Sequence, residues 1–175
     1  LPITGLAEAS KRPESFIGLH FFSPVDKMPL VELIKGEKSS DEAIARGLDY
    51  IQQIRKTPIV VNDSPGFYTS RCFSTSTNEG MTMLAEGINP ALIENAAKMA
   101  GLPVGPLAVM DEVTLDLGYK ITMQTASDLG ESYEFDSGFP VIRKFVEELD
   151  RKGKRFGKGF YEYPEDGKKY LWPGL

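Results

Sequence analysis

Two short apolar runs near the start of the chain constrain its fold most. They span Phe16–Phe22 and Leu30–Ile34, are rich in Phe, Val, Ile and Leu, and are separated by the short turn Ser23–Pro29. Runs of this length and composition, bounded by turn residues, are typical of β-strands. The sequence therefore predicts two adjacent strands. Each carries one conspicuous polar residue: His20, the single histidine of the chain, and Glu32.

His20 and Glu32 are of the residue types that suit proton transfer. Imidazole is the side chain most easily tuned to exchange protons near neutral pH. A carboxylate that faces it can fix its tautomer and stabilise its charged form. On adjacent strands the two residues could form a general base and its orienting partner. From these residues alone, a hydrogen-bonded pair of the protein core is an equally good interpretation.

The rest of the first third alternates helix and strand. Ser39 and Glu42 have the spacing of a capping box, and apolar residues follow at helical spacing, which predicts a helix over Asp41–Lys56. Thr57–Val61 is a short β-branched run and is predicted to be a strand. The order β-β-α-β resembles the trailing half of an α/β sheet domain.

The remainder of the chain has helical patterning. The turn-rich segment Asn62–Gly66 is the best domain boundary. Helices are predicted over Phe67–Glu86, from Pro90 to Gly101 with Asn89 as N-cap, from Pro106 onward, and over Phe139–Lys152.

Two of these helices have predicted apolar faces. The face of the second helix is predicted to consist of Leu92, Ile93, Ala96, Ala97 and Ala100. A single stripe along the third is predicted to consist of Leu107, Met110, Val113, Leu117 and Ile121.

Size, charge and cysteine usage exclude several classes of protein. A chain of 175 residues suits one domain or two small ones, and a net charge of −5 argues against nucleic-acid binding. No apolar stretch approaches the roughly 20 residues of a spanning helix, and the first residues do not resemble a signal peptide. The lone Cys72 excludes an intrachain disulfide, fits a reducing compartment and is expected to be a small buried apolar residue. No metal site is predicted.

Several segments resemble one enzyme family. Gly18–Pro24 followed by Met28–Glu32 is similar to the signature of 3-hydroxyacyl-CoA dehydrogenases, roughly HFFNPVxxMxLVE, in which a His and a Glu also stand twelve positions apart. Further similar segments follow in order, namely Thr57–Val61 with Pro65–Phe67, Gly101–Pro106 with Asp111, and Gly157–Tyr161. The resemblance covers essentially the whole chain. It is greatest to the dehydrogenase part of multifunctional fatty acid oxidation enzymes, bacterial alpha subunits in which an enoyl-CoA hydratase precedes the dehydrogenase.

The resemblance implies a fold and an activity. Residues 1–62 would be the C-terminal part of a Rossmann-type NAD-binding domain. Residues 63–163 would be an all-α domain like the C-terminal domain of 6-phosphogluconate dehydrogenase, and residues 164–175 a tail or linker. The implied reaction is the NAD-dependent oxidation of an L-3-hydroxyacyl-CoA to a 3-ketoacyl-CoA in β-oxidation. The implied partners are the acyl-CoA substrate, a second copy bound through the helical domain and a thiolase subunit, in the bacterial cytoplasm.

The resemblance also implies roles for individual residues. His20 would be the base and Glu32 would hold and stabilise its imidazolium. Ser23 stands where the family has an Asn that contacts the cofactor, and Ser70 where an Asn contacts the substrate. Arg155 stands where some members have a cofactor-contacting Lys. Its charged neighbours could attract the phosphates of NAD or CoA, but a solvated charged face is the favoured interpretation for Arg151, Lys152, Lys154 and Lys158.

Two departures from the family pattern limit the expected activity. The chain has no Gly-rich dinucleotide fingerprint, so the 175 residues alone are expected to lack most NAD affinity and any dehydrogenase turnover. The Ser residues at positions 23 and 70 slightly favour a second hypothesis, a non-catalytic dimerisation or acyl-CoA-binding module of the same fold. The intact pair of His20 and Glu32 favours the enzyme.

Overall fold

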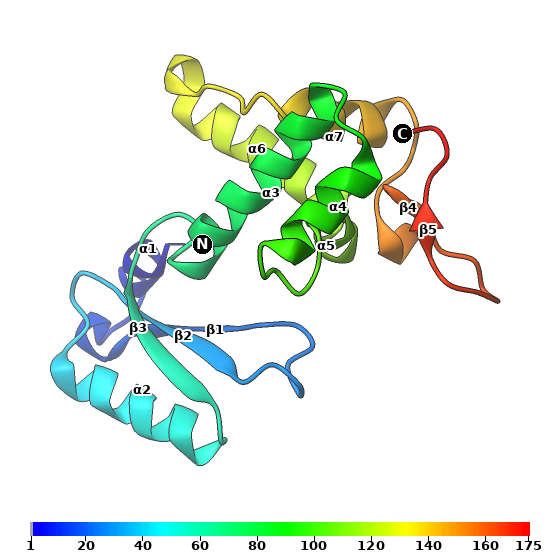
Figure 1. Ribbon diagram of the computed structural model, residues 1–175. Coiled ribbons are helices and arrows are strands. Elements are labelled where there is room, and N and C mark those ends of the chain that lie inside the picture. Colours follow the sequence, from blue (N-terminus) through cyan, green and yellow to red (C-terminus); the bar gives the residue numbers. More distant parts are fainter. Residues whose placement is uncertain (1) are drawn as a thin grey trace. The chain divides into compact units, whose positions relative to one another are not determined.

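A three-stranded mixed sheet forms the centre of the first of two units into which the chain divides, Leu1–Cys72 and Phe73–Leu175. The computed structural model describes residues 2–175. The first unit contains, in order, α1 (Ile3–Ala7), η1 (Pro13–Ser15), β1 (Ile17–Phe21), β2 (Leu30–Lys35), α2 (Asp41–Gln53) and β3 (Thr57–Asn62) (Figure 1). The strand order is β1-β2-β3, with β2 antiparallel to β1 and parallel to β3. The predicted β-β-α-β order is therefore confirmed.

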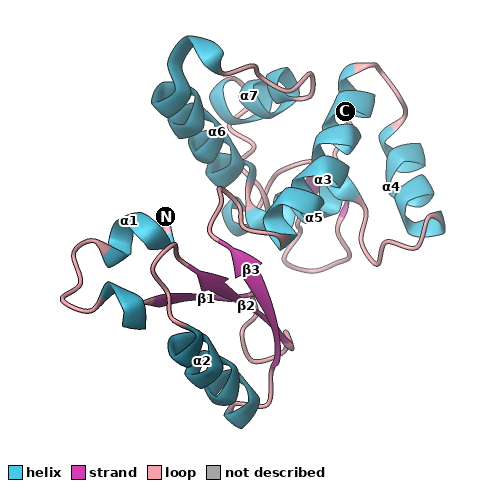
Figure 2. Ribbon diagram, turned by 90° about the vertical axis from the view of Figure 1, so that its left-hand side faces the viewer, coloured by secondary structure: helices cyan, strands magenta, loops and turns pink. Residues whose placement is uncertain are grey.

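The two faces of this sheet differ in what covers them. Val31 and Leu33 of β2 are fully buried against Ile51 of α2, together with Ile17 and Leu19 of β1, and α2 lies along this face (Figure 2). Successive side chains of a strand point to opposite faces. The intervening residues of β1 and β2, which include the predicted His–Glu pair, therefore lie on the face away from α2.

The start and the end of α2 differ from the sequence-based prediction. Its N-cap is Ser40, whose Oγ accepts a hydrogen bond from Ala43 N at 3.2 Å. The predicted cap, Ser39, instead donates its hydroxyl to Phe16 O at 2.6 Å, so the capping box with Glu42 is wrong. The helix ends at Gln53, three residues before the predicted Lys56, because Arg55 adopts a left-handed conformation with φ of 58°.

The second unit is mostly helical. It contains most of α3 (Thr69–Ala85), then α4 (Pro90–Met99), α5 (Pro106–Val113), α6 (Leu115–Leu129), η2 (Gly130–Ser132), α7 (Phe139–Glu147) and η3 (Lys154–Phe156). A small antiparallel pair consists of β4 (Tyr161–Glu162), at the end of the predicted helical domain, and β5 (Tyr170–Leu171), in the segment predicted as a tail or linker. Trp172, just after β5, packs edge-on against the Phe145 ring at 5.8 Å.

The two predicted apolar faces of this unit are only partly right. On α4, Ile93 is buried, as is the charged Glu94, whereas Leu92 is 60% exposed. The stripe predicted from Leu107 onward is not continuous, because the chain breaks at Thr114, with φ of 70°, into α5 and α6. Beyond this break Leu117 is 51% exposed.

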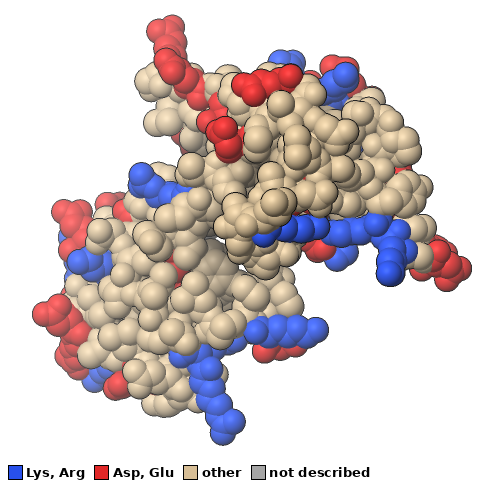
Figure 3. All heavy atoms as spheres, in the orientation of Figure 1, with Lys and Arg blue, Asp and Glu red and all other residues tan. Residues whose placement is uncertain are grey.

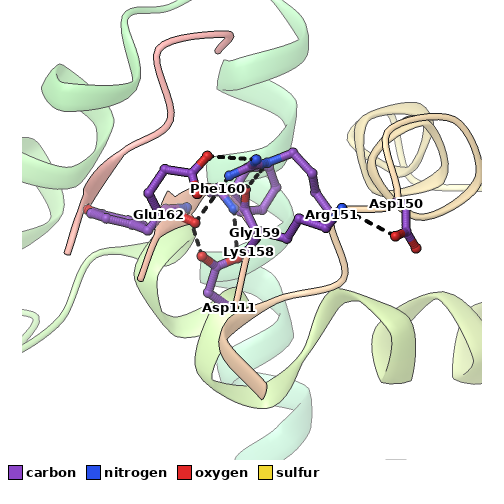
Figure 4. Close-up of polar contacts among 8 residues, drawn as sticks. Asp111, Asp150, Arg151, Lys158, Gly159, Phe160 and Glu162 are labelled. Atoms are coloured by element: carbon purple, nitrogen blue, oxygen red, sulfur yellow. Dashed lines mark hydrogen bonds and ion pairs between the residues drawn. The ribbon is translucent and has the colours of Figure 1, made fainter. Parts of the chain in front are cut away.

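A fully buried carboxylate, Asp111, joins α5 to the segment Gly159–Tyr161. Its oxygens accept hydrogen bonds from Phe160 N at 2.8 Å (Figure 4), from Tyr161 N at 2.9 Å and from the Tyr163 hydroxyl at 2.9 Å. Burial raises the pKa of Asp111 above its ordinary value, although these three hydrogen bonds lower it. The two separate sequence motifs that contain Asp111 and Phe160 are therefore parts of one buried junction.

Arg151 is a second member of this junction and corrects the prediction of a solvated side chain. It is buried, donates Nε–H to Gly159 O at 2.7 Å and pairs with Glu162 at 2.8 Å (Figure 4). Its guanidinium also lies 4.3 Å from the centre of the Trp172 ring.

Gly159 should not tolerate a side chain. A Cβ at this position would lie 2.0 Å from Asp111 Oδ1, so we expect Gly159→Ala to lower the free energy of unfolding by about 3 kcal/mol. Urea unfolding followed by circular dichroism measures this. Gly118→Ala is the matched control, because its Cβ would meet only the Met110 methyl at 3.4 Å, and this change within α6 should be neutral or stabilising. Equal stability of the two variants would contradict the prediction.

Candidate active site

The register of β1 and β2 places His20 directly opposite Glu32. Opposite residues of an antiparallel pair point to the same face of the sheet. His20 Nδ1 accordingly lies 2.6 Å from Glu32 Oε2. The spacing of twelve residues in the sequence thus has a physical origin, since it is the separation that this hairpin register requires.

Glu32 is fully buried, and both of its carboxylate oxygens are used. Oε1 accepts hydrogen bonds from Tyr68 N at 3.1 Å and Thr69 N at 2.8 Å, at the start of α3. Helix N-termini present unpaired N–H groups and a partial positive charge, which stabilise an anion. The carboxylate therefore joins the imidazole to the first turn of α3.

A tight turn before α3 aims these two amides at Glu32. Gly66 and Phe67 both have positive φ, 75° and 49°, and Phe67 N donates to Ser64 O at 2.8 Å. Glycine adopts this conformation without strain, whereas Phe67 does so at a cost. The ring of Phe67 lies 5.9 Å from the His20 ring, and the ring of Phe22 lies 4.7 Å from it.

These contacts determine the ionisation state of the Glu32 carboxyl group. Burial raises its pKa, but the hydrogen bonds from His20 and from the Thr69 and Tyr68 amides outweigh burial, so the pKa of Glu32 is lower than the ordinary value of 4.5. An ionised carboxylate only accepts hydrogen bonds. Nδ1 of His20 therefore carries the hydrogen of the neutral ring, and Nε2 is the nitrogen that can take up a proton. The His20 side chain is 34% exposed, so a substrate can reach it.

The lowered pKa of Glu32 predicts an acid-sensitive contribution to stability. A folded-state pKa below the unfolded value means that this stabilisation is fully present above pH 4.5 and is lost as the pH falls through the folded-state pKa. We expect wild type to exceed Glu32→Gln in free energy of unfolding at pH 7, with a smaller difference well below pH 4.5. Urea titrations of both proteins at the two pH values measure this. A difference that does not change with pH would refute it.

The other predicted site residues lie at different places. Ser70 is half-buried in the first turn of α3, directly after Thr69, and Ser23 is exposed in the loop that follows β1. Both belong to the same unit as His20. Arg155 lies in η3 of the other unit and is exposed. The structure thus brings His20 and Glu32 into contact, and the roles of Ser23, Ser70 and Arg155 stay predictions.

Most charged neighbours of Arg155 are engaged in ion pairs. Lys152 and Lys158 contact Asp150 at 2.8 and 3.2 Å, and Lys154 contacts Glu112 at 2.7 Å. Lys and Arg side chains are interspersed with Asp and Glu on the face of the molecule that Figure 3 shows.

Residue types carry no direct sign of the backbone amides of Tyr68 and Thr69, because any residue type supplies an amide. The signal that could have found them is Pro65–Gly66 just before a helical pattern, which marks a turn into a helix N-terminus.

The expectation that Cys72 is a small buried residue was wrong, since this residue is exposed. Within residues 2–175, no cluster of three or more His, Cys, Asp or Glu could hold a metal ion. No helix in that range is long and apolar enough to span a bilayer.

Comparison with known sequences gives two adjoining family matches. A family model of the 3-hydroxyacyl-CoA dehydrogenase NAD binding domain matches residues 1–64, and one of the 3-hydroxyacyl-CoA dehydrogenase C-terminal domain matches residues 66–163. The fatty acid oxidation complex subunit alpha of Shewanella loihica is 44% identical over 171 residues, which cover 98% of this chain and 24% of the relative. Its counterpart from Shewanella halifaxensis is 46% identical over 169 residues. The chain thus spans about a quarter of the length of these relatives.

Solved structures with the same fold include two 3-hydroxybutyryl-CoA dehydrogenases. The (S)-3-hydroxybutyryl-CoA dehydrogenase of Ralstonia eutropha aligns with a TM-score of 0.84 and 34% identity, over 94% of this chain and 58% of that one. The 3-hydroxybutyryl-CoA dehydrogenase of Escherichia coli aligns with a TM-score of 0.83 and 29% identity, over 96% of this chain and 36% of that one.

Proposed function

Because this chain belongs to the 3-hydroxyacyl-CoA dehydrogenase family, we propose that it supplies the proton-transfer site for the oxidation of an L-3-hydroxyacyl-CoA to a 3-ketoacyl-CoA. The observation that carries the proposal is the hydrogen bond of 2.6 Å between His20 Nδ1 and the buried, ionised Glu32. It leaves Nε2 as the base. A positioned base of this kind contributes about 10²–10⁴-fold to a rate.

The proton steps follow from this geometry. In the oxidation, His20 Nε2 takes the proton of the substrate 3-hydroxyl, and Glu32 stabilises the imidazolium that results. In the reduction, the same imidazolium returns the proton to the carbonyl oxygen. Two further contacts are proposed from the resemblance: Ser70 to the substrate and Ser23 to the cofactor. A serine hydroxyl has one donor where the family's Asn amide has two, so we expect these contacts to be weaker than those of an Asn.

The cofactor of this family is NAD, which accepts the hydride when it is bound. Its pyrophosphate does not fit the turn from β2 into α2. The turn from β2 into α2 has the single glycine Gly36, and Ser40 already caps the helix that follows. A dinucleotide site needs a Gly-rich turn that lets the backbone approach the phosphates. The proposal therefore assigns to this chain the proton-transfer half of the site, with Arg155 as a further proposed cofactor contact.

The biological setting is proposed from the relatives. Those named above are alpha subunits of fatty acid oxidation complexes. We extend the proposal to a dehydrogenase part of such a subunit in β-oxidation, in the bacterial cytoplasm, paired with a thiolase subunit and with a second copy through the helical domain. The domain ranges 1–62, 63–163 and 164–175 belong to this proposal.

A chimera tests the proposal. This chain would replace the 171 matching residues of the Shewanella loihica alpha subunit, and reduction of acetoacetyl-CoA by NADH would be followed by absorbance. We expect the chimera to be active and the isolated 175-residue chain to show no NAD-dependent turnover. A folded chimera that binds acyl-CoA without turnover would favour the non-catalytic module instead. Turnover by the isolated chain would contradict the assignment of only the proton-transfer half.

A further inference from the structure

Lys56 holds the tip of the loop that joins the His20 strand to the Glu32 strand. Its Nζ donates to Val25 O at 2.5 Å and to Met28 O at 2.7 Å, across 31 and 28 residues of sequence. Within the loop, Lys27 N and Met28 N both donate to Pro24 O at 3.0 Å. The ammonium thus binds two carbonyl oxygens of a turn whose hydrogen bonds from Lys27 N and Met28 N are internal to it.

The end of α2 delivers Lys56 to this place. Arg55, in the left-handed conformation, ends the helix, and Lys56 N donates to Ile51 O at 3.1 Å. The next residue, Thr57, starts β3, and its N–H donates to Pro29 O at 2.8 Å. Lys56 therefore stands on a rigid junction between a helix and a strand, while the loop that it holds is exposed from Ser23 to Pro29.

The held loop adjoins the candidate site on both sides. Phe22, with its ring 4.7 Å from the His20 ring, and Ser23 leave β1 directly into it. The loop ends at Leu30, where β2 begins, two residues before Glu32. An exposed loop with few buried apolar contacts opens easily, so its conformation depends on the anchors that it has.

We propose that Lys56 is a positioning residue of the dehydrogenase site. It fixes the loop Ser23–Pro29 and thereby holds Phe22 and Ser23 in place beside His20. This role rests on the proposed function, whereas the anchoring of the loop does not. Lysine suits the task because its ammonium has three donors and no acceptor, which matches two carbonyl oxygens on an exposed turn.

Hydrogen–deuterium exchange of the 175-residue chain tests the anchoring without any turnover. We expect Lys56→Met to speed exchange of the Lys27 and Met28 amides by about tenfold or more. This is the factor that corresponds to the loss of one hydrogen bond from a charged group. Amides of β1 and β2 should keep their protection, which shows that the sheet is intact. Lys56→Arg should retain slow exchange, and Lys38→Met, which removes another exposed lysine of the same unit, should change nothing. Unchanged exchange of the loop in Lys56→Met would overturn the anchoring.

Kinetics of the chimera test the positioning. We expect Lys56→Met to raise the KM of the chimera for its substrates about three- to tenfold with kcat within about twofold, because loop order affects binding more than the base at Nε2. Lys56→Arg should restore the KM. Faster exchange of the loop without a change of KM would overturn the positioning role and leave the anchoring in place. An inactive parent chimera would instead count against the proposed function.

Discussion

Replacement of His20 by alanine is expected to lower the kcat of the chimera by about 10²–10⁴-fold, the usual contribution of a positioned general base. In the proposed mechanism Nε2 takes the hydroxyl proton, and alanine has no group that can do so. The KM for acyl-CoA should change little, because the substrate contacts proposed for this chain lie elsewhere. The loss should therefore appear in kcat and in kcat/KM alike.

Loss of fold is the competing explanation for such a result. The circular dichroism spectrum of His20→Ala should stay that of the parent, since the side chain is one-third exposed, while its thermal midpoint should fall because the buried Glu32 Oε2 loses its hydrogen bond. Lys35→Ala is the matched control, because Lys35 is an exposed residue at the end of the neighbouring strand, and its rate should equal that of the parent. A folded His20→Ala chimera with an undiminished rate would refute the role of His20 as the base.

The first unit was well predicted because each of its signals is local. Short apolar runs predict β1 and β2, a period of 3.6 residues predicts α2, and the turn residues between these elements limit their lengths. The family likeness, and with it the fold class, is confirmed by the family matches over residues 1–64 and 66–163. What local signals miss is contact between distant segments. Tyr68 N and Thr69 N reach Glu32 across 36 and 37 residues, and the types of these residues do not indicate this.

The second unit was less well predicted for a related reason. A helical stripe assumes one continuous helix, but Thr114 divides the segment, and its hydroxyl accepts a hydrogen bond from Leu117 N at 3.3 Å as the cap of α6. Arg151 was misjudged because a cluster of positive charges usually lies in solvent. Its burial depends on Glu162 and Trp172, and nothing in the local pattern connects them to it.

Glu32→Gln should be almost as damaging to turnover as the loss of His20, although the two side chains have nearly the same shape. The amide oxygen of Gln can still accept the hydrogen bonds of Tyr68 N and Thr69 N. Its NH₂ group then faces His20 Nδ1 and requires that nitrogen to be an acceptor. The ring hydrogen moves to Nε2, which can no longer take the substrate proton. In a serine-protease triad the equivalent change of Asp to Asn lowers kcat by about 10⁴-fold, and we expect a loss of about 10³–10⁴-fold here.

Glu32→Ala separates this tautomer effect from stability. Alanine leaves the part-buried amides of Tyr68 and Thr69 without an acceptor, at up to about 1–3 kcal/mol each, so this variant should lose stability as well as activity, whereas Glu32→Gln should remain closer to the parent in urea unfolding at pH 7. Nitrogen-15 NMR of the single imidazole reports the tautomer directly. We expect the hydrogen on Nδ1 in wild type and on Nε2 in Glu32→Gln. If Glu32→Gln kept the wild-type tautomer and still lost activity, a change of tautomer could not be the cause. If it kept both tautomer and activity, the buried carboxylate would serve the fold alone.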